Sequence, residues 1–222
     1  LLDLIWTMGV KADRPRAPLF LAPLLDLDEK FSKQVYTWFS RTNSFAIVKS
    51  NLKTLEISCH GIPWLLGCII SFWLMPSKRA QAFSVNLFIA LLIDILFVAA
   101  IKAFVRRRRP SYNSNDMFAT IGVDKFSFPS GHSSRSTLVA LLCIFLCDLF
   151  FLIDLAVVVW ACSVTLSRVI SGRHYIADMI GGVVLGIMEF IICLAIWLTD
   201  EQSLAIIKWL SDEKSIGPDF DV

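Results

Sequence analysis

Long apolar segments separated by polar connections dominate the chain between residues 55 and 200. The clearest segment covers 82–104, which is apolar apart from Asn86 and Asp94 and leads into four arginines. A helix of about 20 apolar residues is long enough to cross the hydrocarbon core of a bilayer, and a soluble core needs no series of such segments. The pattern therefore predicts an integral membrane protein.

We expect about five membrane spans. They cover 55–75, 82–104, 137–153, 155–169 and 177–198. We expect Pro63 to bend the first span, Pro76 to end it, and the third and fourth spans to form a helical hairpin. The polar connection over 110–129 is longer than compact domains usually contain without a functional reason.

The regions on either side of these spans divide the chain into three parts. Residues 1–54 mix prolines, charges and apolar runs too short to cross a bilayer, which predicts an interfacial segment at the membrane surface. Residues 55–200 form the membrane domain. Residues 201–222 form a polar, acidic tail to which we assign no function.

Composition narrows the class of protein. With 56% hydrophobic and 18% charged residues, the chain is not an ordinary soluble globule, a disordered chain or a disulfide scaffold. The six cysteines lack metal-binding spacing and are most simply small buried hydrophobes.

The net charge is only +2, but the stretch from Lys102 to Arg135 holds seven basic residues against two acidic ones. Phosphate ligands, anionic lipid headgroups or a topology signal would each produce this cluster.

Three motifs lie at the ends of predicted spans, and alternation of the spans places all three on one face of the membrane. Taken singly, each has a structural explanation: a stop-transfer stretch, a turn, or a buried histidine, as we interpret His60. Their convergence on one face favours a shared site. The motifs are Lys102-(six residues)-Arg109-Pro110, Pro129-Ser130-Gly131-His132, and Ser167-Arg168-(five residues)-His174-(three residues)-Asp178.

The third motif suits a nucleophilic histidine. His174 and Asp178 are four residues apart, so on a helix the carboxylate lies beneath the imidazole. There it can fix the tautomer of the ring and stabilise the positive charge that develops when the other nitrogen attacks.

The other two motifs supply groups that bind an anion. Ser130 is a candidate N-cap, and Gly131 permits close approach to the free amides of the first helical turn. Lys102, Arg109 and Arg168 could complete a cage, because arginine forks match phosphate oxygens. His132, adjacent to the amides, is placed to donate a proton to a leaving oxygen.

Acidic residues within the predicted spans need partners, because a charge in the bilayer core is costly. They are Asp94, Asp148 and Glu189. For Glu189 two alternatives stay open: a packing partner in the interior, or no function. Gly182 and Gly186 predict a close helix contact in the same span.

The three motifs together are similar to the signature of the type 2 phosphatidic acid phosphatase (PAP2) family, over residues 102–178. The resemblance implies an all-α, polytopic transmembrane bundle of the PAP2/haloperoxidase type and catalysis without metal or cofactor. It makes His174 the nucleophile that becomes a phosphohistidine, Asp178 its orienting partner, and His132 the acid. The groups implied to hold the phosphoryl oxygens are Lys102, Arg109, Ser130, Gly131 and Arg168.

Flanking residues resemble the polyisoprenoid diphosphate phosphatase branch of that family, at 60–64, 105–112, 115–118 and 123–132. This implies hydrolysis of presqualene, farnesyl and geranylgeranyl diphosphates and monophosphates at the endoplasmic reticulum or nuclear envelope. The basic face, which carries the site, is expected in the cytosol. The wider family has six spans, so five is a departure.

Two other functions stay open. One is a broad lipid phosphate phosphatase acting on phosphatidate, lysophosphatidate or sphingosine phosphate, because the motifs bind the head and not the tail. The other is a catalytically silent scaffold, although no motif residue is missing here. The expected partners are a lipid-tailed diphosphate and the bilayer, without nucleic acid; the oligomeric state is open.

Overall fold

A computed structural model describes residues 21–42, 45–113, 125–147 and 149–212. Within these ranges the protein is all-helical, and the only extended pairing is an isolated bridge between Arg108 and Phe126. The prediction of an all-α fold is therefore confirmed. The helices are α2 (Ala22–Ser40), α3 (Phe45–Ser58), α4 (Gly61–Leu74), α5 (Lys78–Val105), α6 (Gly131–Leu146), α7 (Phe151–Ile170), α8 (Ile176–Ala195) and α9 (Asp200–Asp212).

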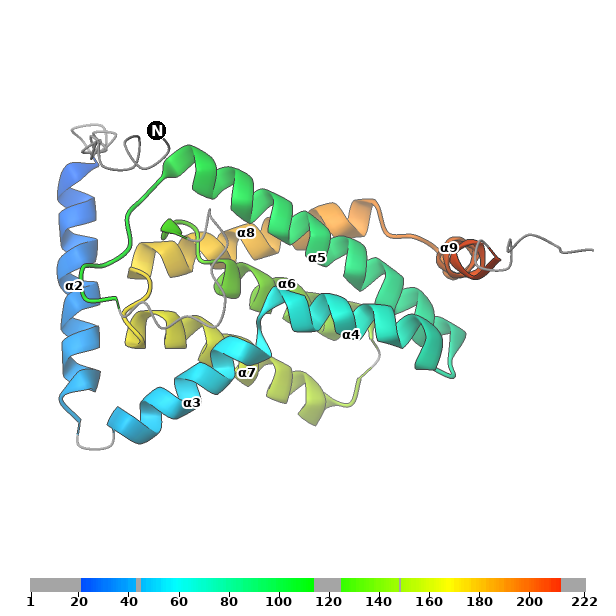
Figure 1. Cartoon of the computed structure of the whole chain (residues 1–222), viewed down its shortest axis with the longest axis horizontal. Helices are drawn as coiled ribbons and strands as arrows, with labels where there is room; N and C mark the ends of the chain where they lie inside the picture. Colours follow the sequence, from blue (N-terminus) through cyan, green and yellow to red (C-terminus); the bar gives the residue numbers. More distant parts are fainter. Residues whose placement is uncertain (1–20, 43–44, 114–124, 148, 213–222) are drawn as a thin grey trace, which may run out of the picture.

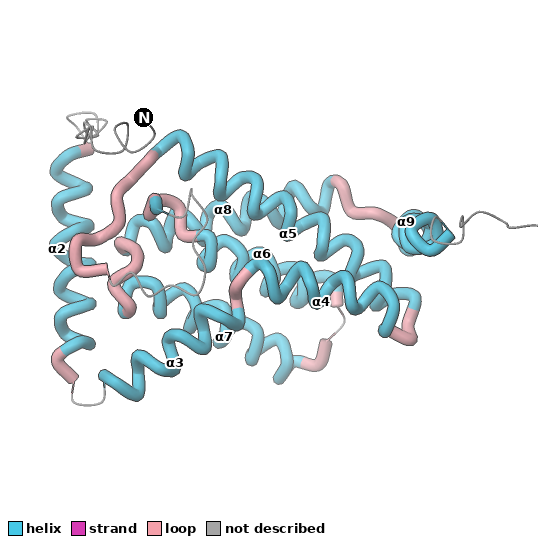
Figure 2. The backbone as a smooth tube through the Cα atoms, in the orientation of Figure 1, coloured by secondary structure: helices cyan, strands magenta, loops and turns pink. Residues whose placement is uncertain are grey.

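The helices α4 to α8 form a bundle in which α6 packs against both α7 and α8, and α4 packs against α5. Figure 1 shows α2 standing across one end of this bundle, at a steep angle to α5 and α8, while α9 lies at the opposite end. The described parts of the connection from α5 to α6, and the connection from α7 to α8, lie at the α2 end (Figure 2). All three sequence motifs therefore meet at that end.

The five predicted spans fall on helices α3 to α8, but among the described residues three helices, or four spans if the bent pair is counted as one, are long and apolar enough to cross a membrane, so the prediction of five is approximate. The helices α5, α7 and α8 are long and apolar enough to cross a membrane, and α3 and α4 qualify together as a pair bent by 45°. The remaining helix, α6, is apolar but has 16 residues. Large apolar side chains such as Leu96 and Phe104 are exposed on the bundle, as expected for helices that face lipid.

Three predicted boundaries differ from the structure. The predicted third span ends at residue 153, whereas α6 ends at Leu146 and α7 begins at Phe151. The first span breaks at Cys59 and His60 and not at Pro63, because Pro63 falls in the first turn of α4, where proline costs no helical hydrogen bond. The hairpin helix α6 begins at Gly131, six residues before the predicted start, because the polar residues of its first turns lie against other helices and not in lipid.

Glycines allow α8 to lie directly on α6. A Cβ atom at Gly182 would lie 2.5 Å from the carbonyl oxygen of Ser130, and one at Gly186 would lie 2.5 Å from that of Ser134. No larger side chain fits without a shift of the backbone. The predicted close contact is confirmed, and it fixes the start of α6 against the start of α8.

Candidate active site

The structure brings the three motifs together at the α2 end of the bundle. Lys102 lies in the last turn of α5, Ser130 caps α6, Arg168 lies in the last turn of α7, and His174 lies in the connection to α8. These four side chains are buried, and His132 in the first turn of α6 is half-buried. Burial of so many polar groups requires partners for each of them.

The hydrogen bonds of His174 determine its tautomer. Its Nδ1 lies 2.8 Å from the carbonyl oxygen of Ser127, which can only accept, so Nδ1 carries the proton. The lone pair is then on Nε2. Asp178 lies farther away, with Oδ2 3.7 Å from Nδ1. Ser127 thus fixes the ring, and Asp178 adds a negative charge beside it.

Burial lowers the pKa of His174 well below the ordinary histidine value, and the positive charges of Arg109, Arg168 and Lys102 lower it further. A lowered pKa means that the ring loses its proton at a lower pH than free histidine, so it is neutral near pH 7. A neutral imidazole with a free Nε2 can act as a nucleophile. The three predicted cationic residues therefore lie near enough to His174 for their charges to act on it.

Asp178 is held by groups other than His174. Its Oδ1 accepts a hydrogen bond from Nη1 of Arg107 at 2.7 Å, and its Oδ2 accepts one from the amide of Tyr175 at 2.9 Å. The guanidinium of Arg107 also lies over the Tyr175 ring, 4.1 Å from its centroid. Arg107 therefore fixes the carboxylate that lies beside the imidazole.

Helix α2 completes this network from outside the bundle. Asp28 pairs with Arg107 across 2.6 Å and accepts the amide of Ala177 at 2.9 Å. Ser32 accepts the amide of Ile176 at 2.9 Å. These contacts satisfy free amides at the start of α8, as an N-cap would. The segment predicted to lie at the membrane surface thus contributes side chains next to the site.

The start of α6 agrees with the N-cap prediction. The Ser130 side chain accepts the amide of Ser133 at 3.4 Å, and its own amide donates to the carbonyl of Asp178 at 3.0 Å. A Cβ atom at Gly131 would lie 3.2 Å from the Val98 side chain, tighter than most such contacts. A glycine there lets α6 begin close to α5.

Glu56 of α3 contacts His132 and two arginines. Its carbonyl oxygen lies 3.2 Å from Nε2 of His132, and its Oε2 lies 3.5 Å from Nη1 of Arg168 and 3.1 Å from Nη2 of Arg173. The charge of Arg168 acts on both His132 and His174. The two rings therefore share one electrostatic environment.

Arg168 keeps one donor for a ligand. Its Nε is buried and has no hydrogen-bond partner among the described residues. A buried donor without a partner is costly, and a phosphate oxygen would satisfy it. Arg109, also predicted to bind phosphate, is half-buried and donates from Nη1 to the carbonyl of Arg173 at 3.5 Å.

The interior acids have partners, as expected. Asp94 pairs with Arg135 at 2.7 Å, and Glu189 accepts a hydrogen bond from Ser134 at 2.8 Å. Of the alternatives for Glu189, these contacts support an interior packing partner. Asp148 lies outside the described residues.

His60 has the structural role we expected. Its Nδ1 accepts the amide of Ile62 at 3.4 Å, which caps α4, and its ring centroid lies 6.5 Å from that of His132. Among the described residues no group of three or more His, Cys, Asp or Glu side chains could hold a metal ion.

Several residues of this site were not identified from the sequence. Glu56 carried a signal, a carboxylate between apolar positions at the start of the predicted span 55–75, and Arg107 lies within the run of arginines. Asp28 and Ser32 had no such signal in the sequence, because only the fold brings α2 to the site. The residues missed are Asp28, Ser32, Glu56, Arg107, Ser127 and Arg173.

The fold and the site together define a class: a helical membrane protein with a buried cluster of cationic side chains near a histidine whose pKa is lowered. The family model of the PAP2 superfamily matches residues 83–202. The chain belongs to the PAP2 superfamily.

Relatives in sequence agree with this assignment. The chain is 31% identical over 209 residues to the probable lipid phosphate phosphatase beta of Arabidopsis thaliana, covering 83% of this chain and 95% of that protein. It is 33% identical over 132 residues to the decaprenylphosphoryl-5-phosphoribose phosphatase of Mycobacterium tuberculosis, covering 57% of this chain and 67% of that protein. The protein is therefore an integral membrane phosphatase of the lipid phosphate type.

Two solved structures share the fold. The PAP2-type phosphatidylglycerolphosphate phosphatase of Bacillus subtilis superposes with a TM-score of 0.57 at 23% identity, covering 78% of this chain and 86% of that one. LpxE of Aquifex aeolicus superposes with a TM-score of 0.55 at 16% identity, covering 76% of this chain and 95% of that one.

Proposed function

We propose that the protein hydrolyses isoprenoid diphosphates and monophosphates, such as presqualene, farnesyl and geranylgeranyl diphosphate, through a phosphohistidine at His174. The observation that carries this proposal is the neutral, buried His174, whose Nδ1 is bonded to Ser127 and whose neighbours are three cations. Such a site attracts a phosphoryl group and presents it with a nucleophile.

The first step forms a bond between Nε2 of His174 and phosphorus and breaks the bond from phosphorus to the leaving oxygen. Burial and the charges of Arg168 and Arg135 lower the pKa of His132 as well, and the negative charge of the bound phosphate raises it again, so His132 is protonated in the complex. It gives its proton to that oxygen, and the electron pair of the broken bond stays on it. Lys102, Arg109, Arg168 and the amides near Ser130 and Gly131 neutralise the transferred oxygens. Asp178, fixed by Arg107, stabilises the positive charge on the His174 ring.

The second step removes the phosphoryl group from His174. Neutral His132 takes a proton from water, the water oxygen bonds to phosphorus, and the nitrogen–phosphorus bond breaks. Inorganic phosphate leaves and both imidazoles return to their starting states. Phosphoryl transfer depends mainly on positioning and on charge neutralisation, which the cations of this site can supply. We therefore propose catalysis without a metal ion.

An isoprenoid substrate is favoured by the branch resemblance at 60–64 and 105–112 and by the relative whose name specifies a decaprenylphosphoryl compound. The lipid phosphate phosphatase relative favours the second candidate, a broad activity on phosphatidate, lysophosphatidate and sphingosine phosphate. The branch resemblance favours the endoplasmic reticulum or nuclear envelope. The basic residues at the α2 end favour a site on the cytosolic face.

The test is phosphate release by purified protein in detergent, with farnesyl diphosphate and phosphatidate compared under equal conditions. We expect faster release from farnesyl diphosphate, activity that persists in EDTA, and no turnover by His174→Ala. The variant should still insert into membranes, because it removes one ring from a site that other residues hold. Normal turnover by His174→Ala would exclude His174 as the nucleophile, and no phosphate release by the wild type would favour the scaffold alternative. Strict dependence on a divalent ion would exclude the metal-free mechanism.

A further inference from the structure

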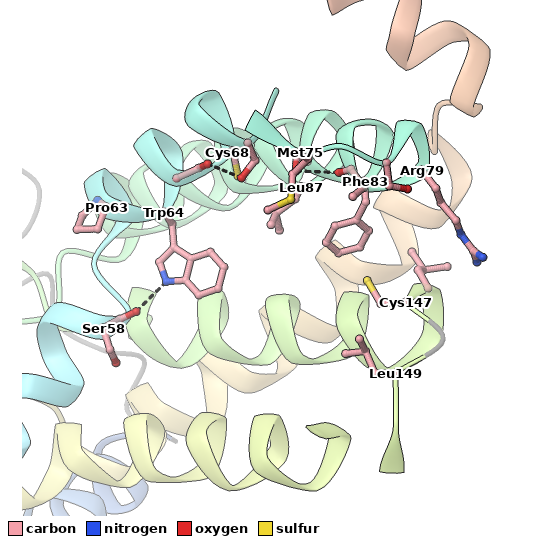
Figure 3. Close-up of a pocket in the computed structure, with 16 residues that line it drawn as sticks. Ser58, Pro63, Trp64, Cys68, Met75, Arg79, Phe83, Leu87, Cys147 and Leu149 are labelled. Carbon is pink, nitrogen blue, oxygen red and sulfur yellow. Dashed lines mark hydrogen bonds between the residues drawn. The ribbon is translucent and has the colours of Figure 1, made fainter. Parts of the chain in front are cut away.

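A groove of about 720 Å³ lies between α4, α5 and the end of α6 (Figure 3). Its walls are mainly apolar, and Figure 3 shows the rings of Trp64 and Phe83 pointing from α4 and α5 into the space above α6. A volume of roughly 300–1,000 Å³ is typical of ligand sites. Pro63, Gly67 and Met75, which also line the groove, are exposed, so it opens on the face of the bundle that meets lipid.

One end of the groove lies beside residues that contact the candidate active site. Ser58, which lines that end, accepts the indole N–H groups of Trp64 and Trp160, at its carbonyl (2.8 Å) and its hydroxyl (3.0 Å). The residues around Ser58 hold His132: the Glu56 carbonyl contacts its ring, and the Cys59 thiol lies 3.5 Å from its carbonyl oxygen. One short segment therefore joins the groove to the proton donor.

The chemistry of phosphoryl transfer indicates which end of the groove the substrate tail enters. In an in-line displacement the leaving oxygen lies opposite the nucleophile, so it lies away from His174 and toward its proton donor. That oxygen carries the apolar tail of the substrate. Since His132 lies against the break between α3 and α4, the tail leaves the site where the groove begins.

We propose that this groove binds the apolar tail of the lipid phosphate substrate, with the tail running from Ser58 along α4 toward Met75. The proposal rests on the proposed function and adds the place where the substrate chain is recognised. The 14 residues of α4 extend about 21 Å by helical rise, enough for a long isoprenyl or acyl chain. Because the walls exclude water from the chain, a longer tail gains binding energy that a short one lacks.

Gly67 provides a direct way to fill the groove. A Cβ atom built at Gly67 meets no other atom within 4 Å, so a larger side chain can enter the space without displacing the backbone. Ser71 lies one turn farther along α4 and also lines the groove. Ile70 is on the same helix and is 54% exposed but does not line the groove, which makes it a matched control.

The experiment compares kcat/KM for a fifteen-carbon and a five-carbon isoprenyl diphosphate in mixed micelles of fixed composition. Gly67→Phe should lower the ratio of long-chain to short-chain kcat/KM by about tenfold, the discrimination expected from changed apolar contacts in a pocket. Ile70→Phe should leave the ratio unchanged. Ser71→Leu provides a second filled groove should Gly67→Phe not fold, and it should lower the ratio in the same direction.

The results that would overturn the proposal are distinct from failure of the proposed function. If the filled variants keep the wild-type ratio, or if Ile70→Phe lowers it equally, the tail lies elsewhere and the groove holds only bulk lipid. If wild-type protein releases phosphate from neither substrate, the proposed function itself is wrong, and the tail proposal fails with it.

Discussion

The α2 end of the bundle and the interior beneath it both bury arginines and carboxylates, but in opposite proportions. In the interior, one cation, Arg135, lies near two acids, Asp94 and Glu189. At the α2 end, cations outnumber acids. The cations are Lys102, Arg107, Arg109, Arg168 and Arg173, and the acids are Asp28, Glu56 and Asp178.

The difference explains what each cluster can do. Two carboxylates facing one arginine in the bilayer core are neutral only when they share a proton, so this cluster gains nothing from an added anion. An excess of cations at the bundle end is neutralised when an anion enters. We infer that the interior cluster serves packing, whereas the end cluster is built to receive a phosphate.

Replacing Arg168 should have the largest effect. Arg168→Ala removes a cation and the buried Nε that has no partner, and we expect at least about a thousandfold loss of kcat/KM, as for other arginines that stabilise a transferring phosphoryl group. Stability should change little, because Arg173 still pairs with Glu56. Phosphate release and thermal unfolding in detergent measure the two quantities.

A charge-preserving variant sharpens this result. Arg168→Lys keeps the positive charge but loses the planar fork, so it should recover only part of the activity. Full activity in Arg168→Ala would mean that the excess of cations at this end has another purpose.

Arg135→Met should show the reverse pattern. It leaves Asp94 buried without its 2.7 Å partner, and breaking a buried pair costs about 3–5 kcal/mol of stability. We expect a large fall in the unfolding temperature. Among molecules that remain folded, the loss of activity should be much smaller than in Arg168→Ala. Adding Asp94→Asn should restore part of the stability; no effect of either change on unfolding would contradict a packing role.

The fold could be predicted because a helix that crosses the bilayer must be long and apolar, and such segments are visible in the sequence. The spans at 82–104 and 177–198 correspond to α5 and α8. The start of α6 could not be placed from hydropathy, because Ser133, Ser134 and Ser136 interrupt the apolar pattern although they are buried against other helices. Their environment is set by packing, which hydropathy does not encode.

The candidate site was predictable only where side chains belong to a fixed local spacing. His174 and Asp178 are four residues apart, and the structure brings them close, at 3.7 Å, although His174 precedes the first residue of α8. Glu56, Arg107 and Asp28 act through contacts with residues far away in sequence. Nothing near Asp28 indicates that α2 crosses the end of the bundle, since that placement depends on the amides at the start of α8.

The smallest effect is expected from a change at Asp28, which connects α2 to Arg107. Asp28→Asn keeps an oxygen for the amide of Ala177 but removes the charge that pairs with Arg107 at 2.6 Å. Arg107 then holds Asp178 less firmly beside His174. We expect kcat to fall about tenfold, the loss of one hydrogen bond between charged groups, with KM nearly unchanged, because Asp28 does not touch the phosphate.

Asp26 is the matched control for this change, because it lies on the same helix and is exposed. Asp26→Asn removes the same charge from α2 without touching Arg107, so its kcat should equal that of the wild type. Asp28→Glu restores the carboxylate and should recover part of the lost rate. Equal kcat values for Asp26→Asn and Asp28→Asn would show that the general charge of α2, and not the contact with Arg107, matters. A rise in KM alone would mean that α2 acts on substrate entry, and the end cluster would then be complete within the bundle itself.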